Sequence, residues 1–247
     1  MLAKILSATA IGIDATIVEA EIDVGPGMPS FNIVGLPDTA VQEARERVRS
    51  ALKNSGFTFP ARRVTVNLAP ASLRKTGSDF DLAIALGILA ATGQTHFNSD
   101  RTIVVGELSL SGEIRPVQGI LPIAHTLSKE ASIYRLFVAG GNAREGAIAG
   151  KVEVYGFRDI NQLSDFLNGN QSMIPTTIDP QSLFIYSNHE EDLLEVKGQR
   201  HGKRALEISA AGGHHLLFVG PPGSGKTMLS KRLPGLLPLL SLEEAIE

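Results

Sequence analysis

The sequence has 247 residues, of which 43% are hydrophobic and 20% are charged, so it can bury a core and differs from a disordered chain. A formal net charge of −3 excludes a polycation, and any nucleic-acid binding must therefore come from a local basic patch. The lack of cysteine excludes disulfides, zinc–thiolate sites and thiol nucleophiles. No apolar stretch reaches the length of a membrane span, and we expect a cytoplasmic protein with no membrane contact.

Strand and helix patterns are mixed along the first 167 residues. Residues 1–15 predict a first strand, and residues 16–24 predict a second, with apolar and acidic residues in strict alternation. After a turn at 25–29, Ser30–Gly35 predicts the return strand. The helix that follows begins with either Asp38 or a capping box at Thr39. Its predicted apolar face consists of Val41, Ala44, Val48, Ala51 and Leu52.

The rest of this region predicts a mixed α and β unit without internal repeats. Further strands are predicted at 63–68, 102–110, 134–139 and 152–157, and helices at 81–92, 120–130 and 159–167. Residues 81–92 are apolar nearly all round, which is typical of a fully buried helix. A polar segment with glycine and proline then predicts a linker over 168–190 and a second domain over 191–247. There we expect a helix at 203–211 and a strand at 215–219.

The strongest motif is Gly220-Pro221-Pro222-Gly223-Ser224-Gly225-Lys226-Thr227, which matches the P-loop pattern. An apolar run precedes it and a helix-compatible run follows it, as the motif requires. Gly223 and Gly225 can adopt backbone angles that turn N–H groups toward phosphate oxygens. The positive end of the following helix favours the same anion. The alternative is a glycine-rich turn that ends in Lys-Thr by chance.

The P-loop predicts ATP and Mg²⁺ as cofactors. We expect Lys226 to contact the β- and γ-phosphates, and the Thr227 hydroxyl to bind the Mg²⁺ that bridges them. A second acidic strand, a water-orienting residue and an arginine finger do not follow in the sequence. We therefore expect the chain to end inside an ATPase domain and to be inactive as an ATP hydrolase by itself.

Residues 192–238 resemble the magnesium-chelatase-like branch of AAA+ ATPases. The resemblance rests on the run Val196-Lys197-Gly198-Gln199, the helix KRALEISAAGGHH and the Arg-Leu-Pro run after the P-loop. In AAA+ proteins the segment corresponding to Val196–Gln199 commonly packs against adenine. The resemblance therefore implies that Val196, Gly198 and Gln199 join the nucleotide site.

Residues 29–57 and 64–87 resemble the bacterial competence-type members of the same branch. This resemblance implies an amino-terminal domain, residues 1–167, similar to the proteolytic domain of Lon, a fold shared with ribosomal protein S5 domain 2. The Lon-type nucleophile position falls on Asp79, with Ser78 one residue away, and the lysine-base position falls on Leu121. A serine needs a base within hydrogen-bond reach, and leucine cannot accept a proton. The resemblance thus implies a proteolytically inactive domain.

Two carboxylates, Asp79 and Asp81, stand at the start of the predicted buried helix. They fit a metal site or an acid–base pair, but capping of the helix and interaction with its dipole is the favoured interpretation. His214 and His215 are adjacent on a predicted strand and point in opposite directions, which makes them a poor metal pair. We expect no metal other than the Mg²⁺ that accompanies ATP.

Basic residues recur at four-residue intervals along the first predicted helix, at Arg45, Arg49 and Lys53. Further basic residues follow at Arg62, Arg63, Arg74 and Lys75. These side chains fit either a surface that contacts nucleic-acid phosphates or an ordinary solvated face, since Glu43 and Glu46 lie among them. The ordinary face is the favoured interpretation.

Three functions follow from the motif and the resemblance. The first is an AAA+ motor that forms a ring, a hexamer, and moves on single-stranded or branched DNA during uptake and recombination. The P-loop motif supports the binding of ATP, whereas only the resemblance implies an action on DNA. The second is the motor subunit of a metal chelatase. The third is an ATP-dependent serine protease, which Asp79 and Leu121 disfavour.

Overall fold

The computed structural model describes residues 1–130, 132, 134–183 and 191–246. The chain divides into two compact units, Met1–Pro180 and Gln181–Glu247. The division falls within the predicted linker, of which residues 184–190 lie outside the described residues. No helix among the described residues is long and apolar enough to cross a membrane.

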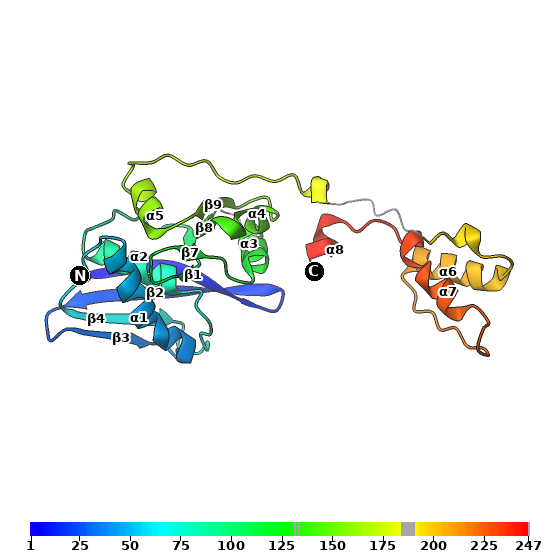
Figure 1. Ribbon diagram of the computed structural model, residues 1–247, viewed down its shortest axis with the longest axis horizontal. Helices are drawn as coiled ribbons and strands as arrows, with labels where there is room; N and C mark the ends of the chain where they lie inside the picture. Colours follow the sequence, from blue (N-terminus) through cyan, green and yellow to red (C-terminus); the bar gives the residue numbers. More distant parts are fainter. Residues whose placement is uncertain (131, 133, 184–190, 247) are drawn as a thin grey trace. The chain divides into compact units, whose positions relative to one another are not determined.

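A seven-stranded sheet forms the centre of the first unit (Figure 1). Its strands are β1 (Leu2–Ile11), β2 (Asp14–Gly25), β3 (Ser30–Val34), β4 (Arg63–Ala69), β5 (Thr102–Val104), β8 (Arg135–Ala139) and β9 (Glu153–Phe157). Their order is β3-β4-β2-β1-β5-β8-β9. Four of the six pairings are parallel, and the two that involve β2 are antiparallel. The predicted α/β class is therefore confirmed, with a mixed and mostly parallel sheet.

Helices cover both faces of this sheet. They are α1 (Thr39–Asn54), α2 (Asp81–Ala91), α3 (Ile120–Ser128), α4 (Ala143–Ala147) and α5 (Ile160–Leu167). One hydrophobic core contains the buried residues of α1, α2 and α5, and a second contains those of α3 and α4. Neighbouring residues of one strand, such as Ile103 and Val104, belong to different cores because successive strand side chains point to opposite faces.

The strand predicted at Ser30–Gly35 is present as β3 and runs in the direction opposite to β2, but it does not return to the place beside β2. β3 does not pair with β2, because β4 lies between them: β4 is antiparallel to β2 and parallel to β3. The turn at 25–29 therefore carries the chain past one strand position instead of closing a hairpin. Alternation alone identifies a strand but does not specify its neighbour.

The sequence pattern located α1 correctly. Its buried residues are the five of the predicted apolar face, and they pack in the first core. Of the two possible caps, the structure uses Asp38, whose Oδ1 accepts a hydrogen bond of 2.8 Å from the N–H of Val41. Such a cap satisfies one of the N–H groups that the first turn of a helix leaves without a partner.

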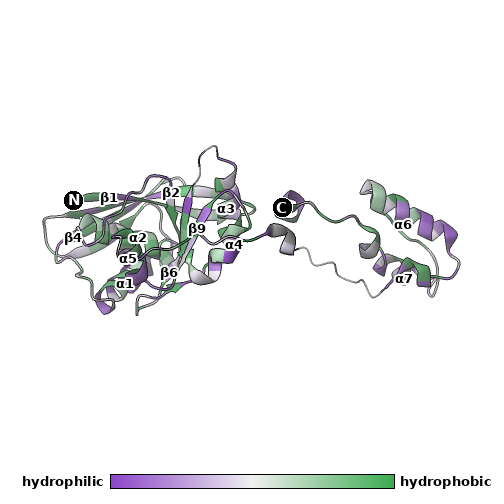
Figure 2. Cartoon of the chain, turned by 90° about the horizontal axis from the view of Figure 1, so that it is seen from above, coloured by the Kyte–Doolittle hydropathy of each residue, from purple (hydrophilic) through white to green (hydrophobic). Residues whose placement is uncertain are grey.

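The helix α2 is buried on all sides, as predicted, and nearly all of it has the hydrophobic colour in Figure 2. The predicted strand at 102–110 is divided into two pieces, β5 and β6 (Glu107–Leu108), and β6 pairs with β7 (Ile114–Arg115) in a small separate sheet. The division occurs because Gly106 bonds to the segment around α2. Its N–H donates to Asp79 O, and its own oxygen accepts from Leu82 N.

The second unit contains α6 (Arg200–Gly212), α7 (Lys226–Lys231) and α8 (Leu242–Ile246). A small hydrophobic cluster of Val196, Leu206 and Leu229 joins α6, α7 and the segment before α6. The predicted strand at 215–219 was wrong: these residues have no regular secondary structure, and Leu217 is 83% exposed. A strand needs a neighbour for its backbone hydrogen bonds, and the described residues of this unit contain no other strand.

Candidate functional site

The P-loop residues form a tight turn before α7. Gly223 and Gly225 have φ angles of +79° and +82°, in the left-handed region that glycine adopts without strain. Helix α7 begins at Lys226, directly after the second of these glycines. The loop thus has the local backbone geometry that the motif predicts, and its N–H groups precede the positive end of a helix.

The Lys226 side chain folds back over the loop. Its ammonium group donates hydrogen bonds of 2.8 Å to Gly220 O and 2.8 Å to Pro221 O, and a longer one of 3.3 Å to Ser224 Oγ. All three acceptors belong to the P-loop itself. The positive charge therefore lies at the concave side of the turn, where an anion bound by the loop would meet it.

A cavity of about 440 Å³ adjoins this loop. It is lined by three parts of the second unit: the first turns of α6, residues 216–221, and Ser224, Lys226 and Leu229 of the loop and α7. Gln199 lines this cavity and donates from Nε2 to Ser224 O at 3.1 Å. Val196 is 2% exposed and lies in the hydrophobic cluster, and Gly198 has a φ of +70°.

Arg232 is a structural residue of this site that the sequence analysis noted only as part of a run. It is 9% exposed, and its guanidinium donates to Asp192 O at 2.8 Å and to Met228 O at 2.8 Å. It also forms a 2.6 Å ion pair with Glu195. Arg232 thus fastens α7 to the segment before α6. The sequence marks Arg232 only by its place in the Arg-Leu-Pro run. Its role could not be predicted from that run, because its hydrogen-bond partners come from residues distant in the sequence.

The residues at the Lon-type positions do not form a serine–lysine pair. Ser78 donates a hydrogen bond to a carboxylate oxygen of Glu107, and that carboxylate also lies 3.6 Å from Arg115. Lys75 is completely buried, its ammonium donates to Pro70 O, and burial lowers its pKa. Leu121 donates its backbone N–H to Glu145 at 3.0 Å.

The prediction that Asp79 and Asp81 cap the buried helix was wrong, because α2 begins after Phe80 without a side-chain cap hydrogen bond. The two carboxylates lie in different environments. Asp81 is 1% exposed and accepts two hydrogen bonds from Arg47, at 2.7 and 3.1 Å. Burial raises the pKa of Asp81, and Arg47 opposes that effect. Burial, with the carboxylates of Asp81 and Glu107 nearby, raises the pKa of Asp79 to about 6. Among the described residues no group of three or more potential ligands fits a metal ion.

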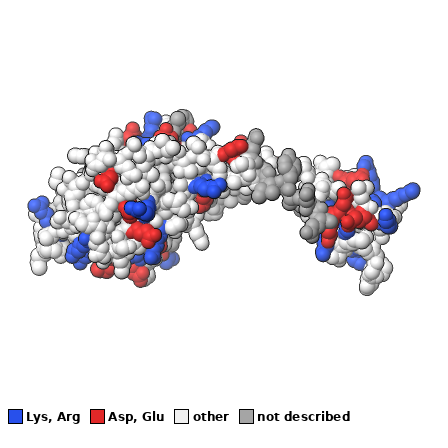
Figure 3. Space-filling model, turned by 45° about the horizontal axis from the view of Figure 1, so that its top comes forward, with Lys and Arg blue, Asp and Glu red and all other residues white. Residues whose placement is uncertain are grey.

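The basic residues of α1 do not share one environment. Arg49 lies over the ring of Phe59, with 5.1 Å between the guanidinium carbon and the ring centroid. Arg45 donates to Gln42 O of its own helix, and Lys53 is exposed. Of the other four basic residues, Arg62, Arg63 and Arg74 are exposed, whereas Lys75 is buried. On the face shown in Figure 3, acidic and basic side chains are interspersed and much of the surface is uncharged.

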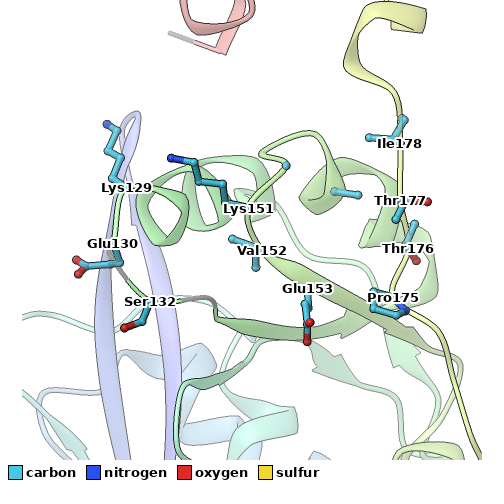
Figure 4. A pocket seen from close by; sticks show the side chains of 12 residues that line it. Lys129, Glu130, Ser132, Lys151, Val152, Glu153, Pro175, Thr176, Thr177 and Ile178 are labelled. Atoms are coloured by element: carbon cyan, nitrogen blue, oxygen red, sulfur yellow. The ribbon is translucent and has the colours of Figure 1, made fainter.

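A second cavity, of about 770 Å³, lies in the first unit at the β9 edge of the sheet (Figure 4). Residues 175–178 form one wall and Lys129, Glu130 and Ser132 the opposite one. Lys151, Val152 and Glu153 lie between them. Two lysines and two glutamates line it, so its charge does not favour a ligand of either sign. None of the candidate residues predicted from the sequence lines this cavity.

Comparison with protein families adds a match to each unit. Residues 20–142 match the model described as subunit ChlI of Mg-chelatase, and residues 192–247 match the model described as magnesium chelatase, subunit ChlI. The competence protein ComM of Haemophilus influenzae is 44% identical over 249 aligned residues, which cover 100% of this chain and 48% of that protein. The chain is a ComM-like member of the magnesium-chelatase family.

Further relatives support this membership. YifB of Salmonella typhimurium is 43% identical over 248 residues, which again cover 100% of the chain and 48% of the relative. The chain thus spans about half the length of the relatives it matches. A local similarity to the archaeal Lon protease of Archaeoglobus fulgidus, at 38% identity over 52 residues, covers 21% of the chain and 8% of that protein. The resemblance to competence-type members of the magnesium-chelatase family is confirmed.

Proposed function

We propose that residues 220–227 of this ComM-like chain bind the triphosphate of ATP together with Mg²⁺, as the nucleotide site of an AAA+ motor. The observation that carries the proposal is the arrangement of the loop. Two glycines with positive φ are followed directly by Lys226 at the start of α7, beside a cavity that can receive the rest of a nucleotide. A glycine-rich turn that ended in Lys-Thr by chance would not be expected to lie at the start of a helix and beside a cavity.

The residues of the loop fit a polyphosphate. A Cβ added at Gly223 would meet no atom within 4 Å, so the backbone there is open to a close-lying ligand. Lys226 supplies a positive charge that is now shared among neutral loop oxygens, all of which a phosphate can replace. The hydroxyl of Thr227, the second residue of α7, would hold the Mg²⁺ that bridges the phosphates.

The proposal is tested by binding of a fluorescent ATP analogue with Mg²⁺. Lys226→Ala is expected to weaken binding about 10- to 100-fold, because a hydrogen bond to a charged group contributes about 1.5–3 kcal/mol. Lys231→Ala removes the same charge from the far end of α7, where Lys231 is 3.9 Å from Glu191, and is expected to bind normally. Equal affinity of wild type and Lys226→Ala would refute the assignment.

For the first unit we propose a Lon-like fold, related to ribosomal protein S5 domain 2, that has lost proteolytic activity. The resemblance of residues 29–57 and 64–87 to the competence-type members supports the fold, and the contacts of the residues at the predicted catalytic positions support the loss. Ser78 is bonded to a carboxylate rather than to a lysine, and the buried Lys75 is bonded to a backbone oxygen. Casein degradation that disappears in Ser78→Ala would contradict the loss.

We further propose that the complete protein assembles into a ring, a hexamer, that moves on single-stranded or branched DNA. The similarity to a competence protein supports this substrate. The experiment is a strand-displacement assay with the full-length protein, forked DNA, Mg²⁺ and hydrolysable ATP. Displacement is expected for wild type and not for Lys226→Ala. Absence of displacement, and of a DNA mobility shift at low salt, would refute the DNA role but not the ATP site.

The alternative is the motor subunit of a metal chelatase. Both matching family models are of a magnesium-chelatase subunit, and this favours the alternative. Co-purification of the full-length protein with a large porphyrin-carrying subunit, without displacement of forked DNA, would establish it.

A further inference from the structure

Gln199 connects the first turn of α6 to the P-loop. Its side-chain Nε2 donates a 3.1 Å hydrogen bond to the backbone oxygen of Ser224. Its own backbone has a φ of 54°, an uncommon left-handed conformation for a residue with a side chain, and α6 begins at the next residue. The helices α6 and α7 lie side by side (Figure 1) and contact each other. Gln199 thus bridges the two elements at their amino-terminal ends.

The bonded oxygen belongs to a peptide that a glycine follows directly. The peptide between Ser224 and Gly225 turns about ψ of Ser224 and φ of Gly225, and Gly225 is a glycine with a φ of +82°. Glycine adopts both signs of φ with similar ease, so such a peptide can rotate between two orientations. In a trans peptide the C=O and the following N–H point in opposite directions. A partner that fixes Ser224 O therefore also fixes the direction of the N–H of Gly225.

This orientation decides whether the loop attracts or repels an anion. With the oxygen of Ser224 held by Gln199, the N–H of Gly225 points the other way and is available to a phosphate. In the rotated orientation, a carbonyl oxygen would face the phosphate instead. The Gln199 amide also lies close to Gly225 itself, since a Cβ added at Gly225 would be 3.8 Å from Gln199 Nε2.

We infer that Gln199 is a positioning residue for the phosphate-binding loop, and that it acts through the Ser224–Gly225 peptide. This inference rests on the proposed function of the loop, and it differs from the adenine contact that the family resemblance implies for Gln199. Gln199 shares the 440 Å³ cavity with His201, Gly202 and Ala205 of α6. Any ligand that displaces this turn of α6 therefore also displaces the support of the loop.

The test separates the phosphate part of the ligand from the base part. The 247-residue chain and its variants are titrated calorimetrically with tripolyphosphate, ADP and adenosine. Gln199→Ala is expected to weaken tripolyphosphate and ADP about 3- to 10-fold, as for the loss of one neutral hydrogen bond, and to leave adenosine unchanged. Gln199→Glu is expected to weaken both phosphate ligands more, because its carboxylate cannot donate to Ser224 O and repels the anion.

Glu207→Gln is the control, because Glu207 lies on α6, forms an ion pair with Arg204 and does not line the cavity. It is expected to bind tripolyphosphate like wild type. Wild-type affinity of Gln199→Ala for tripolyphosphate, or an equal loss for adenosine and ADP, would overturn the inference. If Lys226→Ala also retains wild-type affinity for tripolyphosphate, the P-loop assignment itself fails. If only Lys226→Ala loses affinity, the assignment stands and the role of Gln199 alone is refuted.

Discussion

Replacing Asp79 by asparagine should stabilise the first unit, and only at neutral to alkaline pH. Burial is the largest cause that raises the pKa of Asp79 from its ordinary value of 3.8 to about 6, followed by the carboxylates of Asp81 and Glu107. A carboxyl group whose pKa is higher in the folded chain binds its proton more tightly there than in the unfolded chain. Ionisation of Asp79 therefore opposes folding.

The magnitude follows from this difference in pKa. Below about pH 4 the carboxyl group is protonated in both states, and the effect vanishes. As pH rises from about 4 to 6, the unfolded chain loses the proton first and the folded chain becomes less stable. Above pH 6 the ionised carboxylate lowers the free energy of unfolding by at most about 3 kcal/mol. Because Asp79 is not fully buried, solvent screening reduces this to about 1–2 kcal/mol.

The assay is thermal unfolding followed by circular dichroism between pH 4 and pH 8. Asp79→Asn should raise the midpoint by about 3–6 °C at pH 8 and leave it nearly unchanged at pH 4, since 1 kcal/mol corresponds to about 2–4 °C in a unit of this size. Asp100→Asn, which removes an exposed carboxylate, is the control and should have a small effect at every pH. A gain for Asp79→Asn that does not depend on pH, or a loss at pH 8, would refute the reasoning.

Three further results are expected. Arg47→Ala leaves the buried carboxylate of Asp81 without its ion pair. Denaturant titration at neutral pH should then show a free energy of unfolding that is lower by about 3–5 kcal/mol. A loss below about 1 kcal/mol would contradict a buried ion pair. Gly87→Ala places a Cβ against Cδ1 of Ile22 and should lower the free energy of unfolding by about 1–3 kcal/mol, seen as a lower midpoint of thermal unfolding. An unchanged midpoint would mean that the neighbouring core side chains rearrange without loss of stability. If α1 contacts a single DNA strand, replacing its exposed lysine by Lys53→Gln should reduce the slope of log affinity against log salt by about 0.7 in fluorescence anisotropy; an unchanged slope favours the ordinary solvated face.

Helix α1 shows how much local pattern can predict. Its apolar residues recur with helical spacing, and the same five residues are buried in the structure. The choice between Asp38 and Thr39 as its cap was open, because both residue types accept hydrogen bonds from a helix start. The structure uses Asp38, which also accepts a 3.3 Å hydrogen bond from Gly77 N. That second contact joins residues 39 positions apart, and no local pattern contains it.

The strands show where local pattern is insufficient. The sequence identified β3 as an extended segment, but its parallel neighbour β4 begins about 30 residues later in the sequence. The apolar residues at 215–219 have the composition of a strand, yet none forms because no described strand lies beside them. A strand is stabilised by hydrogen bonds to another segment, whereas the hydrogen bonds of a helix lie within the segment itself.

The sequence by itself determined the P-loop, the buried helix α2, the apolar face of α1 and the family to which the chain belongs. These features depend on the spacing of residues within one short segment, or on the direct succession of glycines and a lysine. Only the tertiary structure decided that Ser78 bonds to Glu107, that Arg47 neutralises Asp81 and that Gln199 holds Ser224. Each of these contacts joins residues at least 25 positions apart, and the folding of the chain, not its local spacing, brings such partners within hydrogen-bond distance.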